Sequence, residues 1–224
     1  MRIGMTIVSI GMTIVSIPLF AAEPPPKSRT YSVSVSHHSS ITLSDAQARK
    51  ILDDASKILK EENECNVTFK LKEPVKTFNS PETPSIVNES NIEAVHRFDE
   101  SSDADLHVKV VKQITEFCRV RSQGGFNGCS WPIDFRSSIV VDSPTPAQGT
   151  ADDPKKLTPI LWTHELGHLM GIPHSTSRNS LMTGCHIRET DKVVTKDECL
   201  CFLSGPGVGG KCDLVHPIPS CSRP

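Results

Sequence analysis

The feature that most constrains this chain is a pair of histidines, His164 and His168, four residues apart in a segment with helical character. Thr158 followed by Pro159 is a typical helix start, because the N–H that proline lacks would have no partner at the first helical position. On a helix that begins there, both imidazoles project from the same face and can meet one metal ion. The spacing therefore predicts a helix that carries two nitrogen ligands.

Gly171 and His174 complete this pattern. A glycine at position 171 can adopt the positive φ that ends a helix and turns the chain sharply, so that His174 returns as a third nitrogen ligand. Three protein ligands leave the fourth tetrahedral position open, which is typical of a catalytic zinc rather than a structural one. Glu165 is displaced from the metal but can reach a water beside it. We therefore predict one zinc ion, with Glu165 as the proton-transferring group and three ligands: His164, His168 and His174.

The complete spacing H-E-x-x-H-x-x-G-x-x-H, at residues 164–174, resembles that of the metzincin metallopeptidases. Eight residues beyond the third histidine, Met182 lies in a segment that is similar to the Met-turn these enzymes place beneath the zinc. Taken alone, Met182 would be interpreted as a gap-filling core residue. The resemblance implies an α+β zincin fold, in which a twisted, mostly parallel sheet and two helices lie above the zinc cleft and an irregular subdomain lies below it.

The same resemblance implies a chemistry. A metzincin is a zinc-dependent endopeptidase, in which the glutamate, here Glu165, takes a proton from the attacking water and passes it to the leaving amine. The substrate, a protein or peptide, would pair with a sheet edge, which we expect within residues 124–141. The pocket for the side chain after the scissile bond would come from residues 175–195. A secreted toxin, adhesion or binding protein on the same scaffold, with narrow or no proteolysis, is the alternative function.

The subfamily stays open at this level. Ser175, directly after the third histidine, is most similar to matrixins, whereas residues 128–129 and 137–142 are reminiscent of adamalysins. Tyr31 is the only tyrosine, so the Met-turn tyrosine that binds zinc in astacins and serralysins has no counterpart. An outlying secreted branch therefore stays open beside a matrixin-like one.

Residues 1–22 are predicted to be a signal peptide. No charged residue occurs between positions 3 and 22, and residues 4–10 are repeated without change as residues 11–17. The two alanines at the end of this stretch are the small residues expected at a cleavage site. An uncleaved membrane anchor is the alternative, since about 20 apolar residues can span a bilayer. The eight cysteines lie outside this stretch and indicate disulfides, so we predict secretion to the extracellular space or the periplasm.

Four segments are predicted along the chain: the signal peptide, an extended lead-in at residues 23–43, the catalytic domain at 44–204 and a cysteine-containing extension at 205–224. Ordered structure is expected to begin at Ser44, which can cap a helix. Periodicity predicts helices at residues 45–62 and 196–203, and strands at 67–71, 104–111 and 138–141. In the last helix, which Thr195 caps, three residues are expected to be buried: Leu200, Phe202 and Leu203.

Composition limits the partners. Lys plus Arg is 24 and Asp plus Glu is 26, so the formal net charge of −2 provides no basic surface and argues against nucleic acid as a main partner. After signal removal, no segment is apolar enough for stable membrane insertion. Calcium is a lesser expectation at the acidic residues between Asp99 and Asp105, because charged loops of this kind are usually only solvated. Cys185 and His186 are expected to form a disulfide and an exposed side chain rather than a second metal site.

Overall fold

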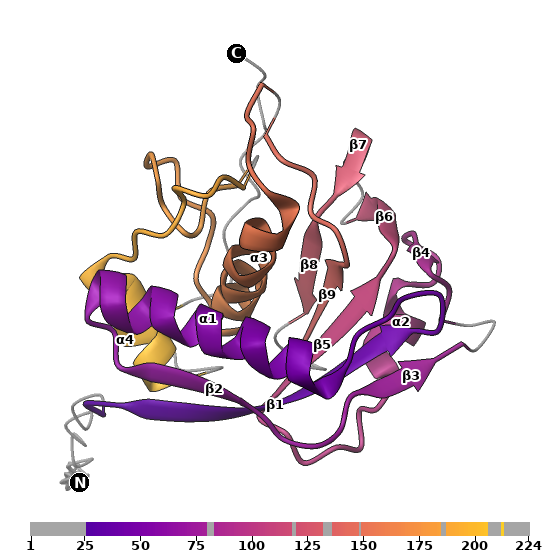
Figure 1. The fold of residues 1–224 in the computed structure, drawn as a ribbon, viewed down its shortest axis with the longest axis horizontal. Coiled ribbons are helices and arrows are strands. Elements are labelled where there is room, and N and C mark those ends of the chain that lie inside the picture. Colours follow the sequence, from indigo (N-terminus) through magenta and orange to yellow (C-terminus); the bar gives the residue numbers. More distant parts are fainter. Residues whose placement is uncertain are drawn as a thin grey trace, which may run out of the picture.

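The computed structural model describes residues 26–79, 83–117, 120–131, 136–147, 149–184, 187–205 and 212. This part of the chain is α+β, with a mostly parallel sheet and four helices (Figure 1), an arrangement compatible with the zincin-like fold that the resemblance implies. The predicted signal peptide and most of the cysteine-containing extension lie outside the described residues. None of the described helices is both long enough and apolar enough to cross a membrane.

The main sheet has six strands, which come from distant parts of the sequence. Five of them lie in the order β2-β1-β5-β9-β8, and β3 pairs with the C-terminal end of β1. Every pairing is parallel except that of β8 with β9, so β8 is an antiparallel strand at one edge. A smaller sheet holds β4, β6 and β7. The strand bounds are β1 Arg29–His38, β2 Val67–Leu71, β3 Lys76–Phe78, β4 Ile86–Val87, β5 Leu106–Val111, β6 Gln113–Phe117, β7 Val120–Phe126, β8 Gly128–Trp131 and β9 Ser137–Val141.

Strand β1 corrects one expectation. Ordered structure begins well before Ser44, because β1 lies within the predicted lead-in and pairs with β2, β3 and β5. Val33 and Val35 are buried on one face of this strand, and Ser34 and Ser36 are buried on the other. A central parallel strand usually shows a continuous apolar run. The serines interrupt that run, which explains why the strand is not evident from the sequence.

Helix α1 (Asp45–Asn63) follows its predicted limits to within one residue. Ser44 caps it through a capping box, in which Ser44 accepts from the Gln47 N–H and the Gln47 side chain accepts from the Ser44 N–H. A disulfide from Cys65 to Cys199 ties the corner between α1 and β2 to the C-terminal helix. Four residues of the apolar stripe that predicts this helix are fully buried, namely Ala48, Leu52, Ala55 and Leu59, whereas Ile51 is partly buried.

The C-terminal helix α4 (Lys196–Ser204) is capped by Thr195, as predicted. Phe202 is fully buried, and its carbonyl accepts a hydrogen bond from the Tyr31 hydroxyl at 2.6 Å, which fixes α4 against β1. Leu200 is 43% exposed, so the prediction that it is buried is wrong. Two positions along a helix correspond to about 200°, so Leu200 lies on the side opposite Phe202.

Helix α3 (Pro154–Leu169) begins earlier than predicted. Asp153 caps it, and Pro154 rather than Pro159 occupies the first position. Asp153-Pro154 and Thr158-Pro159 are both a capping residue followed by proline, which is typical of a helix start. The helix begins at the first of these two pairs. Pro159 therefore lies inside the helix, where its missing N–H removes one backbone hydrogen bond. The predicted start at Thr158 is wrong, whereas the helix does contain both histidines.

The two faces of the main sheet are covered by different helices. Helices α1 and α3 pack against each other, and α3 covers β8, β9 and β5 on what we call the helix face. The short helix α2 (Ile92–Arg97) lies on the opposite face, the α2 face, where His96 meets the ring of Trp131 edge-on. Because side chains alternate along β8, Gly128 and Ser130 point to the helix face instead.

Candidate metal centre

The C-terminal end of α3 turns the chain back toward its own last turn. The Ile172 N–H donates to the Gly167 carbonyl over 3.1 Å, and the Gly171 N–H donates to the His168 carbonyl over 3.0 Å. These two bonds form a Schellman motif. Gly171 has a positive φ of 81°, which confirms the conformation predicted for it. The reversal carries His174 back to the two histidines of the helix.

The three imidazoles meet at one point. The Nε2 atom of His168 lies 3.0 Å from that of His164 and 3.0 Å from that of His174. Among the described residues, they are the one set of three or more His, Cys, Asp or Glu side chains whose ligand atoms all lie within 4.8 Å of one another. The geometry therefore brings together the three histidines that the sequence singles out.

Hydrogen bonds at the outer nitrogens fix the tautomers of two of these rings. The Nδ1–H of His164 donates to the Leu181 carbonyl, and that of His168 donates to the Ile172 carbonyl, each over 2.7 Å. In the neutral rings both Nε2 atoms therefore carry a lone pair and no proton, so neither can donate to the other. Two lone pairs that face each other at 3.0 Å repel unless a cation lies between them. This donor set fits zinc, and carbonyl partners of this kind are typical of metal-binding histidines.

Burial keeps the three histidines neutral. Loss of hydration lowers the pKa of His164 to about 4, and the neighbouring His174 adds to this shift. The pKa of His168 is lowered well below its ordinary value by burial and then by the other two imidazoles, and burial lowers the pKa of His174. At neutral pH all three rings therefore present the unprotonated nitrogen that binds metal.

Glu165 directly follows His164 in α3, and strand β8 contacts its carboxylate. The residue is 4% exposed, and its Oε2 accepts a hydrogen bond from Ser130 Oγ at 2.6 Å. Burial raises the pKa of Glu165 to about 8, and the Ser130 hydrogen bond opposes part of that rise. Ser130 is not evident from the linear sequence, because only the pairing of β8 with β9 brings it to Glu165.

Met182 lies in a tight turn that packs against α3. The Thr183 N–H donates to the Ser180 carbonyl over 3.2 Å, and Met182 is fully buried. Its sulfur lies 2.7 Å from the position that a Cβ on Gly167 would occupy, so the glycine allows this close approach. The same turn supplies the Leu181 carbonyl that orients His164, a contact that the linear spacing does not reveal.

The acidic residues considered for calcium have other partners. Asp99 accepts a hydrogen bond from Ser34 at 2.8 Å and forms an ion pair with Lys76 at 2.6 Å. Asp105 accepts hydrogen bonds from the N–H and the hydroxyl of Ser32. These contacts hold the two carboxylates to the sheet. The remaining candidates for a second metal site lie outside the described residues: Cys185 and His186.

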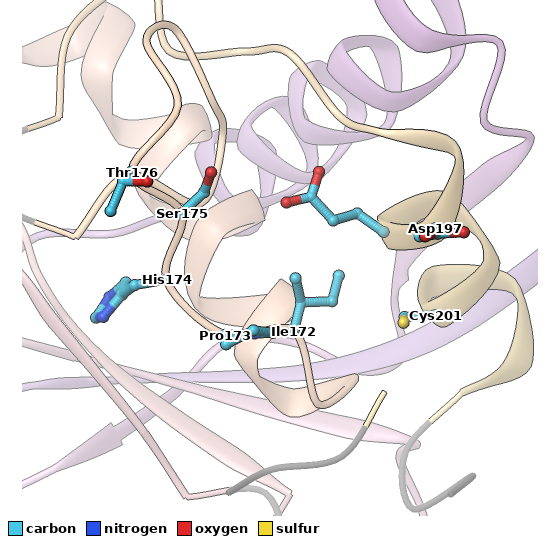
Figure 2. A pocket seen from close by; sticks show the side chains of 8 residues that line it. Ile172, Pro173, His174, Ser175, Thr176, Asp197 and Cys201 are labelled. Atoms are coloured by element: carbon cyan, nitrogen blue, oxygen red, sulfur yellow. The ribbon is translucent and has the colours of Figure 1, made fainter. Parts of the chain in front are cut away.

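A pocket of about 570 Å³ lies beside the third histidine, between residues 172–176 and the start of α4 (Figure 2). In this view the His174 ring points away from Asp197 and Cys201 on the far side of the pocket. The Nε2 atom of His174, which lies 3.0 Å from that of His168, faces the other histidines. Leu181, which lies in the segment predicted to line a substrate pocket, is fully buried and belongs to the core.

Solved structures that are similar to this chain include zinc-dependent peptidases. No protein-family profile matches the chain, and no curated protein matches its sequence. A zinc-dependent peptidase from Methanocorpusculum labreanum shares 14% identity with a TM-score of 0.47, over 76% of this chain and 100% of that one. Archaemetzincin from Methanopyrus kandleri shares 14% identity with a TM-score of 0.43, over 84% and 93%. Metalloproteinase-II from Bacteroides fragilis shares 13% identity with a TM-score of 0.48, over 85% and 57%. At these scores the similarities do not assign a family.

Proposed function

We propose that this chain is a zinc-dependent endopeptidase of the metzincin type. The observation that carries the proposal is the convergence of three Nε2 atoms, two of them on rings fixed by backbone carbonyls, with the buried Glu165 on the helix that holds both of these rings. A set of three protein ligands leaves room for water and substrate at the metal. In this proposal Glu165 transfers protons, Met182 supports the site from beneath, and the zinc ligands are His164, His168 and His174.

The proposed reaction is hydrolysis of a peptide bond. When bound, zinc would supply a Lewis acid that polarises the peptide carbonyl and lowers the pKa of water. Glu165 takes a proton from the attacking water as the new carbon–oxygen bond forms. It then gives that proton to the leaving nitrogen as the carbon–nitrogen bond breaks. Burial, which raises the pKa of Glu165 to about 8, suits a group that both accepts and releases a proton near neutral pH.

Strand β8 is the proposed docking edge for the substrate. Among the described strands it pairs with β9 alone in the main sheet, and it lies within residues 124–141, where a docking edge is expected from the sequence. Gly128 and Ser130 of this strand lie against Glu165. An extended peptide that adds to β8 through backbone hydrogen bonds would therefore pass close to the proton-transferring group.

We also propose that the protein is secreted and belongs to a matrixin-like or outlying secreted branch. The charge-free stretch at residues 3–22 is typical of a signal peptide. The disulfides Cys65–Cys199 and Cys201–Cys212 suit an oxidising compartment. Such bonds stabilise a chain that acts outside the reducing cytoplasm.

The test is degradation of casein by the oxidised chain, run beside Glu165→Ala and with and without a zinc chelator. We expect cleavage at about one zinc per chain. The Glu165→Ala protein should keep its zinc and lose activity by about 10²-fold to 10⁴-fold, because its ligands remain and its proton-transferring group is absent. One zinc per chain without any cleavage would favour the toxin, adhesion or binding alternative. A folded chain that binds no zinc would contradict the proposal.

A further inference from the structure

We infer that strand β8 orients the carboxylate of Glu165 through two positioning residues, Ser130 and Gly128. The inference rests on the proposed function, because the carboxylate it concerns is the proposed proton-transferring group. Both residues act through Glu165 and neither is a metal ligand. The edge strand proposed to receive the substrate therefore also sets the geometry of the group that carries out proton transfer.

Ser130 holds one oxygen of the carboxylate. Its Oγ lies 2.6 Å from Glu165 Oε2, 2.9 Å from the Glu165 backbone carbonyl oxygen and 2.8 Å from Ser138 Oγ. A serine hydroxyl has a single proton, and the shortest of these contacts leads to the acceptor that can carry a full charge. Ser138 can donate in turn to Ser130. The proton of Ser130 is then directed to Oε2.

The hydrogen bond at Oε2 leaves the second oxygen, Oε1, for proton exchange. Ser130 donates to Oε2, and Oε2 still accepts that hydrogen bond when a proton is bound at Oε1, because the oxygen keeps its lone pairs. The contact between Ser130 and Glu165 therefore holds the carboxylate in one orientation while the proton is exchanged at Oε1.

Gly128 leaves room for the second oxygen. A Cβ at this position would lie 2.2 Å from Glu165 Oε1 and 2.5 Å from the carboxyl carbon, so any side chain would displace the carboxylate. The register of β8 on β9 pairs Gly128 with Val140 and Ser130 with Ser138, which fixes both positioning residues within the sheet. Groups held by regular elements keep their geometry better than groups on loops. The hydrogen bond from Ser130 and the space left by Gly128 together select a single orientation of the Glu165 carboxylate.

The sharpest test compares Ser130→Thr with Ser130→Val, which have the same shape and differ by one hydroxyl. The full chain is secreted, oxidised and loaded with zinc, and its cleavage of a fluorescence-quenched peptide substrate is measured. We expect Ser130→Val to lower kcat by about 10-fold to 100-fold, because misplacing a reacting group by about 1 Å has an effect of that size. KM and zinc content should change by less than about twofold, and Ser130→Thr should retain most of the activity. Equal kcat values for the two variants in an active enzyme would overturn the inference.

Gly128→Ala tests the second contact, and Ser36→Ala is the matched control. The added Cβ must displace Oε1, so kcat should fall by about 10-fold to 100-fold while the zinc stays bound. Ser36 is also a buried serine of the same sheet, but it lies on the α2 face of β1, so its removal should leave kcat unchanged. An unchanged kcat in Gly128→Ala would show that Glu165 does not depend on this gap.

A second readout separates this inference from the proposed function. Thermal unfolding of the metal-free protein is measured for Ser130→Val, Glu165→Ala and the double variant. If Ser130 contacts Glu165, Ser130→Val should lower Tm in the presence of Glu165 and change it much less in the Glu165→Ala background. Additive Tm shifts would overturn the contact whether or not the protein is a peptidase. Absence of any hydrolysis by the zinc-loaded wild-type chain, with a non-additive cycle, would overturn the proposed function and keep the contact.

Discussion

Two groups of buried titratable side chains lie on opposite faces of the main sheet, and they share the same electrostatic signature. On the helix face, burial lowers the pKa of the three candidate ligands. On the α2 face, burial and then the charge of Lys109 lower the pKa of His96 to about 3 and that of His107 to about 4. Burial also lowers the pKa of Lys109 to about 8. A shifted pKa therefore does not distinguish the two groups.

The direction of the polar atoms does distinguish them. On the α2 face two of the groups have separate neighbours: Lys109 Nζ donates to the Phe98 carbonyl, and His96 Nε2 lies 3.7 Å from Cys129 Sγ. On the helix face the nitrogens face one another at 3.0 Å, with their protons on the far side of two rings. Burial perturbs pKa values wherever it occurs, whereas convergence of lone pairs needs a cation. The group on the α2 face is therefore structural, and the group on the helix face is the candidate site.

The largest expected contrast is between His168→Gln and His96→Gln. His168→Gln removes the imidazole that lies 3.0 Å from both other candidate ligands, so we expect loss of most of the zinc and a fall in hydrolysis of about 10³-fold or more. His96→Gln should keep about one zinc per chain, because His96 lies on the α2 face. Elemental analysis and a peptide assay measure both effects. Zinc loss in His96→Gln alone would show that the two groups have been assigned the wrong way round.

A smaller contrast concerns acid stability in the metal-free protein. The folded pKa of His96, about 3, lies below its unfolded value of roughly 6.5, so the unfolded state binds more protons as pH falls below 6.5. The free energy of unfolding should therefore decrease with falling pH, by about 2 kcal/mol at pH 5 from this residue alone. Urea unfolding of wild type and His96→Gln at pH 7 and pH 5, with chelator present, measures the difference. The variant should lose that much less stability between the two pH values, and parallel losses would contradict the buried neutral state of His96.

The fold could be predicted from the sequence where local signals agree with tertiary packing. Helix α1 has a capping residue and an apolar stripe of constant spacing, and its limits follow from these alone. Helix α3 has two equivalent start signals, and only packing decides that Asp153 rather than Thr158 is the cap. Strand β1 has serines on its second face, which signal an exposed segment until α2 and its flanking loop cover them. Both faces of β1 are buried by elements that are distant in the sequence, so this burial cannot be predicted from the strand's own residues.

The candidate site shows the same division. The three histidines and Glu165 follow from their spacing, because helix periodicity and one glycine fix their relative positions. The groups that orient them do not follow from it. The Leu181 carbonyl comes from a turn 17 residues beyond His164, and Ser130 comes from a strand 35 residues before Glu165. Such contacts depend on how strands and turns assemble, so a linear motif shows the candidate ligands and not the groups that orient them.

The smallest expected effect is that of Met182→Leu, and it tests whether convergence of the histidines depends on the sulfur. Met182 is fully buried against Gly167, and leucine has a similar volume, so we expect a loss of less than about 1.5 kcal/mol in unfolding free energy. Zinc content should stay near one per chain and kcat within a few-fold, because in the proposed site Met182 supports the candidate ligands by shape alone. Gly167→Ala is the contrasting variant, since its Cβ would lie 2.7 Å from the Met182 sulfur and 3.2 Å from the Phe202 ring, so the buried Met182 side chain would have to move. It should weaken zinc binding more than Met182→Leu does, because the turn that holds Met182 also carries the Leu181 carbonyl that orients His164. Zinc loss in Met182→Leu without loss of stability would mean that the sulfur itself contributes to the metal centre.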